Sequence, residues 1–143
     1  MFIKQISVFL ENKSGRLAEV TRLLSEGGVN LLALSIADTA DFGVLRIIAD
    51  HPEKAHDILK SAGIGARVTE VIAVCVSDKP GGLYRALSVL ENENISVEYI
   101  YAFTAGLEGD ALVIFRVRDN ARAVETLGGA GIRCLDREEL KSL

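Results

Sequence analysis

The same sequence pattern occurs twice in this chain of 143 residues, and no other feature constrains the fold as strongly. ISVFLENKSGRLAEVTRLLSEGGVNLLALSIA begins at Ile6, and IAVCVSDKPGGLYRALSVLENENISVEYIYAF begins 66 residues later, at Ile72. Two residues are then inserted in the second copy, so that Ala55 corresponds to Ala123 at an offset of 68. Two copies are too few for a stacked repeat array. The repeat therefore predicts one small module that is used as a pair.

The two modules are predicted to occupy residues 1–69 and 70–143. A module of this size is marginally stable on its own, because a short chain buries a small fraction of its surface. We therefore expect the two modules to bury surface against each other. No linker separates them in the sequence, which predicts a rigid connection rather than two independent domains.

Apolar residues in the first module follow the periods of strands and helices in turn. They alternate over residues 3–11, which predicts a strand with one buried face. Leu17, Val20 and Leu24 then recur at helical spacing. The remaining expected elements are strands at about 30–37 and 43–49 joined by a turn at 38–41, a helix starting at Pro52, and a strand that begins near Ala66 and continues into the second module.

The second module repeats this order of elements. Pro80 is well placed at the start of its first helix, and a short strand is expected around Ile132. Residues 136–141 have the composition of a capped helical turn. Each module is thus predicted to be βαββαβ, an α+β fold in which two helices cover one face of an antiparallel sheet.

The segment between the first strand and the first helix is the most informative part of each module. It reads ENKSGRL at residues 11–17 and SDKPGGL at residues 77–83. Glycine at a helix entrance lets a ligand approach the free N–H groups of the first turn, which attract a carboxylate. Asn12 or Asp78 could accept hydrogen bonds from an ammonium group, so the segment suits a zwitterion. The same residue types also favour helix N-caps, for which Ser14 is a candidate, and tight turns.

Composition excludes several classes of function. The net charge is −4 and Lys and Arg do not cluster, so a nucleic-acid partner is not expected. No leader and no apolar run of membrane-spanning length precede or interrupt the modules, which predicts a cytoplasmic protein with no membrane partner. Cys75 and Cys134 are expected to be reduced thiols. His51 and His56 are too poorly spaced for a metal site, and no acid–base pair indicates catalysis, so neither a cofactor nor enzymatic activity is predicted.

Aromatic residues alternate at Tyr99, Tyr101 and Phe103. An aromatic sheet face in a βαββαβ fold is typical of RNA-recognition motifs, whose aromatic rings stack on bases. Such a platform needs basic residues around it, and this chain has none there. We therefore interpret the aromatic residues as an apolar patch that another surface covers.

Three features together resemble the ACT domain family: the motif DKPGGL, a helix that ends before NISV, and the closing pattern LxxAGI. The resemblance covers nearly the whole chain as two consecutive ACT domains. It implies a ferredoxin-like fold and a regulatory protein that binds amino acids or similar small ligands at interfaces between paired domains. Most ACT domains are attached to metabolic enzymes, whereas this chain resembles a free-standing pair.

The resemblance also implies which residues hold the ligand, namely the first loop, the start of the first helix and the start of the second strand. These positions are Asn12, Ser14, Gly15, Arg16, Leu17 and Asn30 in the first module, and Asp78, Gly81, Gly82, Leu83 and Ser96 in the second. The first module has Ser14 where the family usually has proline, and the second has Ser96 where the first has Asn30. These departures leave open whether one loop or both bind ligand.

Two functional hypotheses follow from the sequence. In the first, the protein is an amino-acid sensor without catalytic activity. It is expected to form a homodimer because one sheet face is too apolar to stay in water, and that face includes Phe9, Cys75, Tyr99 and Tyr101. In the second, it is a non-catalytic regulatory subunit that docks on an amino-acid biosynthetic enzyme. The contact surface would then include the aromatic strand and the acidic helix face around Glu91 and Glu93.

Overall fold

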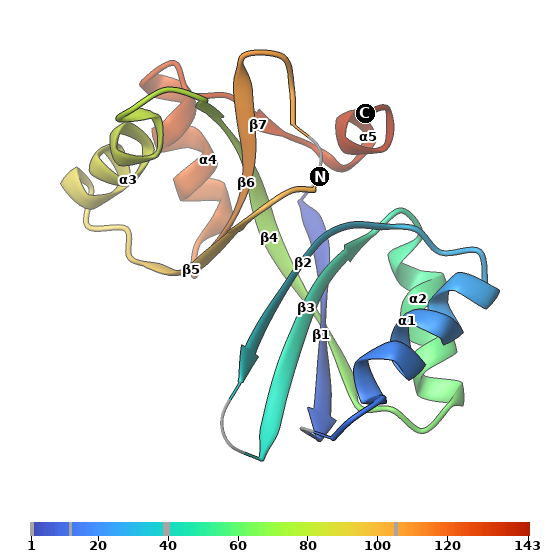
Figure 1. Ribbon diagram of the computed structural model, residues 1–143. Helices are drawn as coiled ribbons and strands as arrows, with labels where there is room; N and C mark the ends of the chain where they lie inside the picture. Colours follow the sequence, from blue (N-terminus) through green and yellow to red (C-terminus); the bar gives the residue numbers. More distant parts are fainter. Residues whose placement is uncertain (1, 12, 39–40, 105) are drawn as a thin grey trace. The chain divides into compact units, whose positions relative to one another are not determined.

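The computed structural model describes residues 2–11, 13–38, 41–104 and 106–143. The protein divides into two compact units: an N-terminal unit of Lys4–Thr69, and a C-terminal unit of Glu70–Leu143 that also takes in the start of the chain up to Ile3. The strand β4 (Ala66–Ser77) begins in the first unit and ends in the second (Figure 1). None of the described helices combines the length and the apolar character needed to cross a membrane.

The N-terminal unit confirms the predicted order of elements. Its antiparallel strands lie in the order β2-β3-β1, and α1 and α2 lie side by side over one face of this sheet (Figure 1). Of the predicted turn at 38–41, residues 39 and 40 lie outside the described part of the chain. The elements are β1 (Ile3–Glu11), α1 (Arg16–Glu26), β2 (Leu31–Asp38), β3 (Phe42–Ala49), α2 (Pro52–Ser61) and the first residues of β4.

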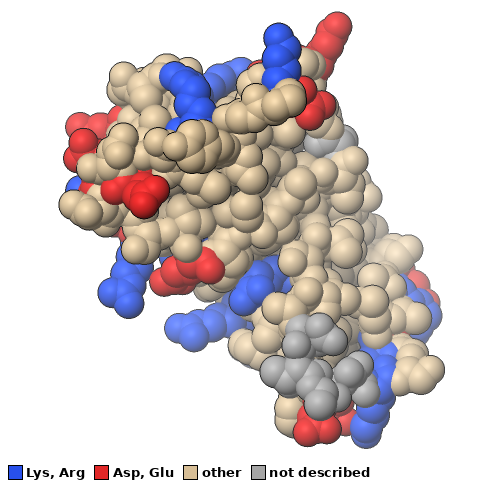
Figure 2. All heavy atoms as spheres, turned by 60° about the vertical axis from the view of Figure 1, so that its left-hand side comes forward, with Lys and Arg blue, Asp and Glu red and all other residues tan. Residues whose placement is uncertain are grey.

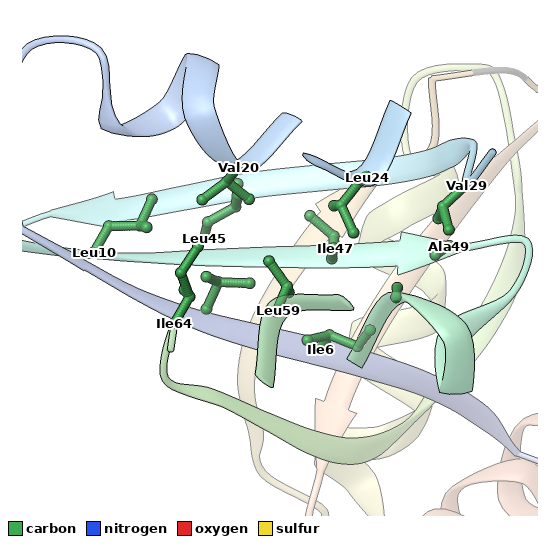
Figure 3. Packing of buried hydrophobic residues seen from close by; sticks show 12 residues of the cluster. Ile6, Leu10, Val20, Leu24, Val29, Leu45, Ile47, Ala49, Leu59 and Ile64 are labelled. Carbon is green, nitrogen blue, oxygen red and sulfur yellow. The ribbon is translucent and has the colours of Figure 1, made fainter. Parts of the chain in front are cut away.

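The core of the N-terminal unit lies between its sheet and its two helices (Figure 3). Ile6 of β1 and Ile47 of β3 are paired across the sheet and point to the same side as Leu24 of α1 and Leu59 of α2. All four side chains are at most 1% exposed. Complete burial of such side chains stabilises the fold by about 1.5–3 kcal/mol each, which explains why the apolar periods of the sequence determine the elements.

The C-terminal unit has the same plan with one addition. Its strands lie in the order β5-β6-β4, β7 pairs with the other edge of β4, and α3 and α4 cover one face (Figure 1). A capping box between Asp136 and Glu139 starts α5, as the composition of the tail predicted. The elements are the rest of β4, α3 (Gly82–Asn92), β5 (Val97–Ala102), β6 (Asp110–Val117), α4 (Asn120–Gly129), β7 (Cys134–Leu135) and α5 (Arg137–Lys141).

The last strand of the C-terminal unit begins two residues later than the strand predicted around Ile132. Gly131 adopts a left-handed conformation, with φ of 79°, and ends the helix α4. The Ile132 N–H then donates to the Leu127 carbonyl at 2.9 Å, and the Ile132 side chain packs into the core. The apolar residue that indicated a strand is therefore part of the helix termination, in which such a contact is common.

The aromatic residues of β5 lie on the sheet face opposite to α3 and α4. Tyr101 is paired with Ile114 of β6, and the Tyr99 and Tyr101 rings stack with their centroids 6.4 Å apart. Tyr101 is 8% exposed and Ile114 is fully buried. The aromatic strand therefore is not an open platform, in agreement with its interpretation as a covered apolar patch.

Candidate ligand-binding site

A glycine in a left-handed conformation precedes the first helix of each unit. Gly15 is the N-cap of α1, with φ of 84°, and Gly81 is the N-cap of α3, with φ of 91°. The prediction that Ser14 is the N-cap is wrong. The turn closes through backbone hydrogen bonds instead, from the Arg16 N–H to the Lys13 carbonyl at 3.3 Å and from the Gly82 N–H to the Lys79 carbonyl at 3.0 Å.

This arrangement leaves the next two N–H groups of each helix directed at the space in front of it. Glycine has no side chain that could cap them, and the intrahelical ladder begins only with the Glu19 N–H and the Arg85 N–H. Among the described residues, nothing accepts a hydrogen bond from the Leu17 or Leu83 N–H groups. A Cβ placed on Gly15 or on Gly81 would meet no atom within 4 Å. Both helix starts therefore offer an open anion-binding position.

The other members of the predicted loop sites have different surroundings. Gly82 is required by packing alone, because a Cβ there would lie 1.9 Å from the Ser77 carbonyl oxygen. Leu17 and Leu83 are exposed apolar side chains, at 41% and 36%, beside the open helix starts. Arg16 donates to Glu19 within its own helix at 2.9 Å. Asn12 lies outside the described residues.

Charges in the first loop form a local pair. The Lys13 ammonium group lies 2.7 Å from the Glu11 carboxylate, and this hydrogen bond, together with the positive charge of Lys13, lowers the pKa of Glu11. In the second loop, Asp78 is exposed and its backbone N–H donates to the Gly109 carbonyl at 3.2 Å. The carboxylate of Asp78 is therefore at the surface next to the start of α3.

The predicted strand-start residues lie at the far end of the sheet from the loops. In the N-terminal unit, Glu11 is paired with Phe42 at one end of β3, whereas Leu31, the residue after Asn30, is paired with Ala49 at the other end. The helix α1 spans the sheet between them, and its 11 residues are about 16 Å long. One unit therefore does not bring its own loop and Asn30 to the same ligand.

The C-terminal unit shows the same separation. Ser77 is paired with Asp110 at one end of β6, and Val97, the residue after Ser96, is paired with Val117 at the other. Ser96 instead lies at a cavity of about 510 Å³. This cavity includes charged residues that the sequence analysis did not single out. Its lining consists of Asn94, Ile95, Ser96, Glu98, Arg118, Asp119 and Arg122.

Metal-binding and nucleophilic chemistry find little support in the described part of the chain. No group of three or more His, Cys, Asp and Glu side chains there could hold a metal ion. Cys75 and Cys134 are free, half-buried thiols, as predicted. Burial raises the pKa of both, that of Cys134 to about 11, so both stay protonated at neutral pH. Figure 2 shows Lys and Arg side chains interspersed with Asp and Glu, so that face has no basic stripe for a nucleic acid.

Comparison with known proteins gives one family and several similar structures. The family described as "ACT domain pair" matches residues 1–143. The crystal structure of protein BT0572 from Bacteroides thetaiotaomicron is 38% identical in sequence, with a TM-score of 0.92, and the match covers 100% of this chain and 98% of that one. No curated protein matches the chain.

Two more distant structures share the fold. The ligand-free regulatory subunit of aspartate kinase from Thermus thermophilus is 18% identical with a TM-score of 0.67, and the match covers 91% of this chain and 93% of that one. The regulatory subunit of aspartate kinase from Thermus flavus is 13% identical with a TM-score of 0.65, covering 92% and 94%. At these identities the likeness concerns the fold alone.

Proposed function

Because the chain belongs to the ACT domain pair family, we propose that it is a non-catalytic regulatory protein that binds a free amino acid between ACT domains. The observation that carries this proposal is the pair of open helix starts behind Gly15 and Gly81. Each helix start presents two N–H groups to an open space, because the preceding glycine has no side chain and no other atom lies within 4 Å of where its Cβ would be. The carboxylate of the ligand binds these N–H groups, where the helix dipole favours negative charge.

The rest of the ligand needs groups from a second module. Burying the ammonium group of the ligand is costly unless hydrogen-bond acceptors or an opposite charge surround it. Asn12 or Asp78 supplies only some of these acceptors. In our proposal Asn30 or Ser96 of another module completes the site, because each lies at the far end of the sheet from the loop of its own unit. The second module belongs to the same chain or to a second copy in a homodimer. A site that joins two modules also explains how ligand binding would change the state of the protein.

A thermal-shift screen of the common amino acids tests this function. A specific ligand raises the melting temperature, and the rise grows with the logarithm of ligand concentration above the dissociation constant. Asn30→Ala and Asp78→Ala should each weaken the binding by about 1–3 kcal/mol, because each leaves a buried ligand group unpaired. If no amino acid shifts the melting temperature at millimolar concentration, the sensor proposal fails.

A second candidate function is a regulatory subunit that docks on an amino-acid biosynthetic enzyme. The specific observation in its favour is that two structures with this fold are regulatory subunits of aspartate kinase. A purified candidate enzyme, immobilised and mixed with the full chain, separates the two functions. Capture that is independent of added amino acids supports docking, whereas capture that requires an amino acid supports a sensor that acts through the enzyme.

A further inference from the structure

The N-terminal unit uses one of its own carboxylates to hold the start of β2. The Asn30 backbone N–H donates to Oδ1 of Asp50 at 2.9 Å, and the Asp50 backbone N–H donates to the Asn30 carbonyl at 3.0 Å. Asp50 directly follows β3 and precedes His51, the N-cap of α2. Its carboxylate therefore occupies the corner between the start of β2 and the start of α2.

The C-terminal unit has an arginine at the corresponding position. Ser96 corresponds to Asn30 at the offset of 66, and Arg118 corresponds to Asp50 at the offset of 68. The structures agree with this correspondence, because β2 and β5 start one residue later with the same irregularity in register. Among the described residues, neither hydrogen bond of the N-terminal unit recurs between Ser96 and Arg118. A guanidinium group has no acceptor, so Arg118 does not replace the carboxylate of Asp50.

The cavity of about 510 Å³ lies at this corner of the C-terminal unit. Ligand cavities are typically about 300–1,000 Å³, so a small molecule fits. The Arg118 side chain is 93% exposed, with its Nε 3.8 Å from a Glu98 carboxylate oxygen. Arg122 is fixed at the edge of the cavity by two hydrogen bonds. Its guanidinium group donates to the Glu93 carbonyl at 2.5 Å, and its backbone N–H donates to the Asp119 carboxylate at 3.1 Å. The cavity thus combines the exposed cation of Arg118 with the carboxylate of Glu98.

We propose that this cavity is a second ligand site, specific to the C-terminal unit, for the carboxylate and ammonium groups of a free amino acid. The ligand carboxylate takes the place that the Asp50 side chain has in the N-terminal unit: it accepts from the Ser96 backbone N–H and pairs with the Arg118 guanidinium. The ligand ammonium group pairs with Glu98, whose carboxylate lies 3.7 Å from Arg116 and 3.8 Å from Arg118. In the N-terminal unit the corresponding position is already filled by Asp50.

This site does not include the loop behind Gly81, because Ser96 and Gly81 lie at opposite ends of the same sheet. Ser96 also belongs to the loop site of another module in the proposed function, whereas Arg118 and Glu98 belong to this cavity alone. The Leu17 and Leu83 amides in turn belong to the loop sites alone, so the two proposals can fail independently. Amide resonances of the ¹⁵N-labelled full chain distinguish them, since each site contains backbone N–H groups of its own. Glycine is the probe, with glycinamide as a ligand that lacks the carboxylate and sodium chloride as a control for ionic strength.

Glycine should shift the Ser96 amide resonance and saturate it, whereas glycinamide and sodium chloride should not. Arg118→Asp supplies the carboxylate from the chain itself, as Asp50 does, and should weaken glycine binding at least tenfold. Lys141→Asp, an equal change of charge on the exposed face of α5, is the matched control and should bind as the unaltered chain does. Glu98→Gln should weaken the binding of glycine but not that of acetate, which has no ammonium group.

Two results would overturn the inference. One is a Ser96 resonance that glycine does not saturate, and the other is an unchanged glycine titration in Arg118→Asp. A saturable shift confined to the Leu83 and Tyr84 amides would overturn this site and support the loop site. A saturable shift at Ser96 that Arg118→Asp abolishes, with no shift at the Leu17 and Leu83 amides, would support this site and count against the loop sites.

Discussion

A Cβ at Gly82 would lie 1.9 Å from the carbonyl oxygen of Ser77, so the loop before α3 closes only with glycine at this position. The contact is with backbone, which a rotamer change does not relieve. Gly81, the preceding residue, has open space beside it and is constrained by its φ of 91° instead. The two adjacent glycines of the DKPGGL motif are thus needed for different physical reasons. Gly82 is needed because of close packing, and Gly81 because of its backbone conformation.

Gly82→Ala should therefore lower the free energy of unfolding by about 1–3 kcal/mol, the usual cost of forcing extra volume into a packed site. Gly128→Ala is the matched control, because a Cβ at Gly128 in α4 would meet nothing within 4 Å. It should leave stability unchanged or raise it by up to about 1 kcal/mol through helix propensity. Urea unfolding followed by circular dichroism measures both, and equal stability of the two variants would contradict the packing argument.

The core of the N-terminal unit gives a second prediction. Leu59 of α2 is fully buried between the helices and the sheet. Leu59→Ala should lower the free energy of unfolding by about 2–5 kcal/mol, because a cavity remains where the side chain was. Leu34→Ala, at a position that is 45% exposed, should change it by about 0.5 kcal/mol or less. Similar midpoints for the two variants in urea would show that α2 does not contribute to the cooperative core.

The start of α5 should respond to acid. The hydrogen bond from the Asp136 backbone N–H, followed by the hydrogen bond from Arg133, lowers the pKa of Glu139 from its ordinary value of 4.5. A carboxylate with a lowered pKa in the folded state stabilises that state fully above the ordinary pKa and stops doing so as the pH falls through the lowered pKa. The α5 amides should therefore lose protection from hydrogen exchange below about pH 4.5.

Glu139→Gln should remove most of this pH dependence. Glu138→Gln is the matched control, because Glu138 is the adjacent carboxylate, is 82% exposed and lies as far as 3.9 Å from Lys141. It should retain the acid transition of the unaltered chain. If the transition persists in Glu139→Gln and disappears in Glu138→Gln, the acid response comes from Glu138 and the prediction is wrong.

The thiols provide a fourth prediction. Burial raises the pKa of Cys134 to about 11 and also raises that of Cys75, so the thiolate that reacts with alkylating agents is scarce near neutral pH. Iodoacetamide at pH 7–8 should modify both cysteines much more slowly than in the urea-unfolded chain, and Cys134 should be the slower of the two. Mass spectrometry of peptides measures each rate. Rapid modification of Cys134 in the folded chain would contradict its burial.

Much of the fold could be predicted from sequence because it rests on local patterns with a simple physical cause. The alternation at Ile6, Val8 and Leu10 gave the buried face of β1, and Pro52 marked the first residue of α2. The two errors, at Ser14 and Ile132, share one cause. In both cases a backbone hydrogen bond next to a left-handed glycine shapes the end of a helix. At Ser14 we had expected a side-chain cap instead, and at Ile132 we had expected a strand.

The candidate site was less predictable, because its members depend on where strands end in space. The loops lie at the opposite end of each sheet from Asn30 and Ser96. This separation follows from the pairing register of the strands, which cannot be derived from the sequence alone. Arg118 and the cavity beside it were missed because the comparison of the copies emphasised the residues they share. The difference between Asp50 and Arg118 at one equivalent position was the more informative observation.

The last prediction concerns the loop sites and separates ligand binding from helix stability. Leu83 follows the first residue of α3 and is 36% exposed. Leu83→Asp places a negative charge in the first turn, where it stabilises the helix by about 0.3–1 kcal/mol but repels the carboxylate of a ligand at the same N–H groups. The melting temperature of the unliganded chain should therefore hold or rise, while the shift caused by an amino acid should fall.

Leu83→Asn removes the same apolar contact without adding charge, so it isolates the electrostatic effect and should keep a larger ligand-induced shift. Leu17→Asp makes the equivalent change at α1, where the side chain is 41% exposed. Comparing the three variants with a common amino-acid ligand shows whether one loop or both bind. An undiminished shift in a chain that carries both Leu17→Asp and Leu83→Asp would mean that the ligand carboxylate does not bind at the helix starts, and the proposed site would have to be abandoned.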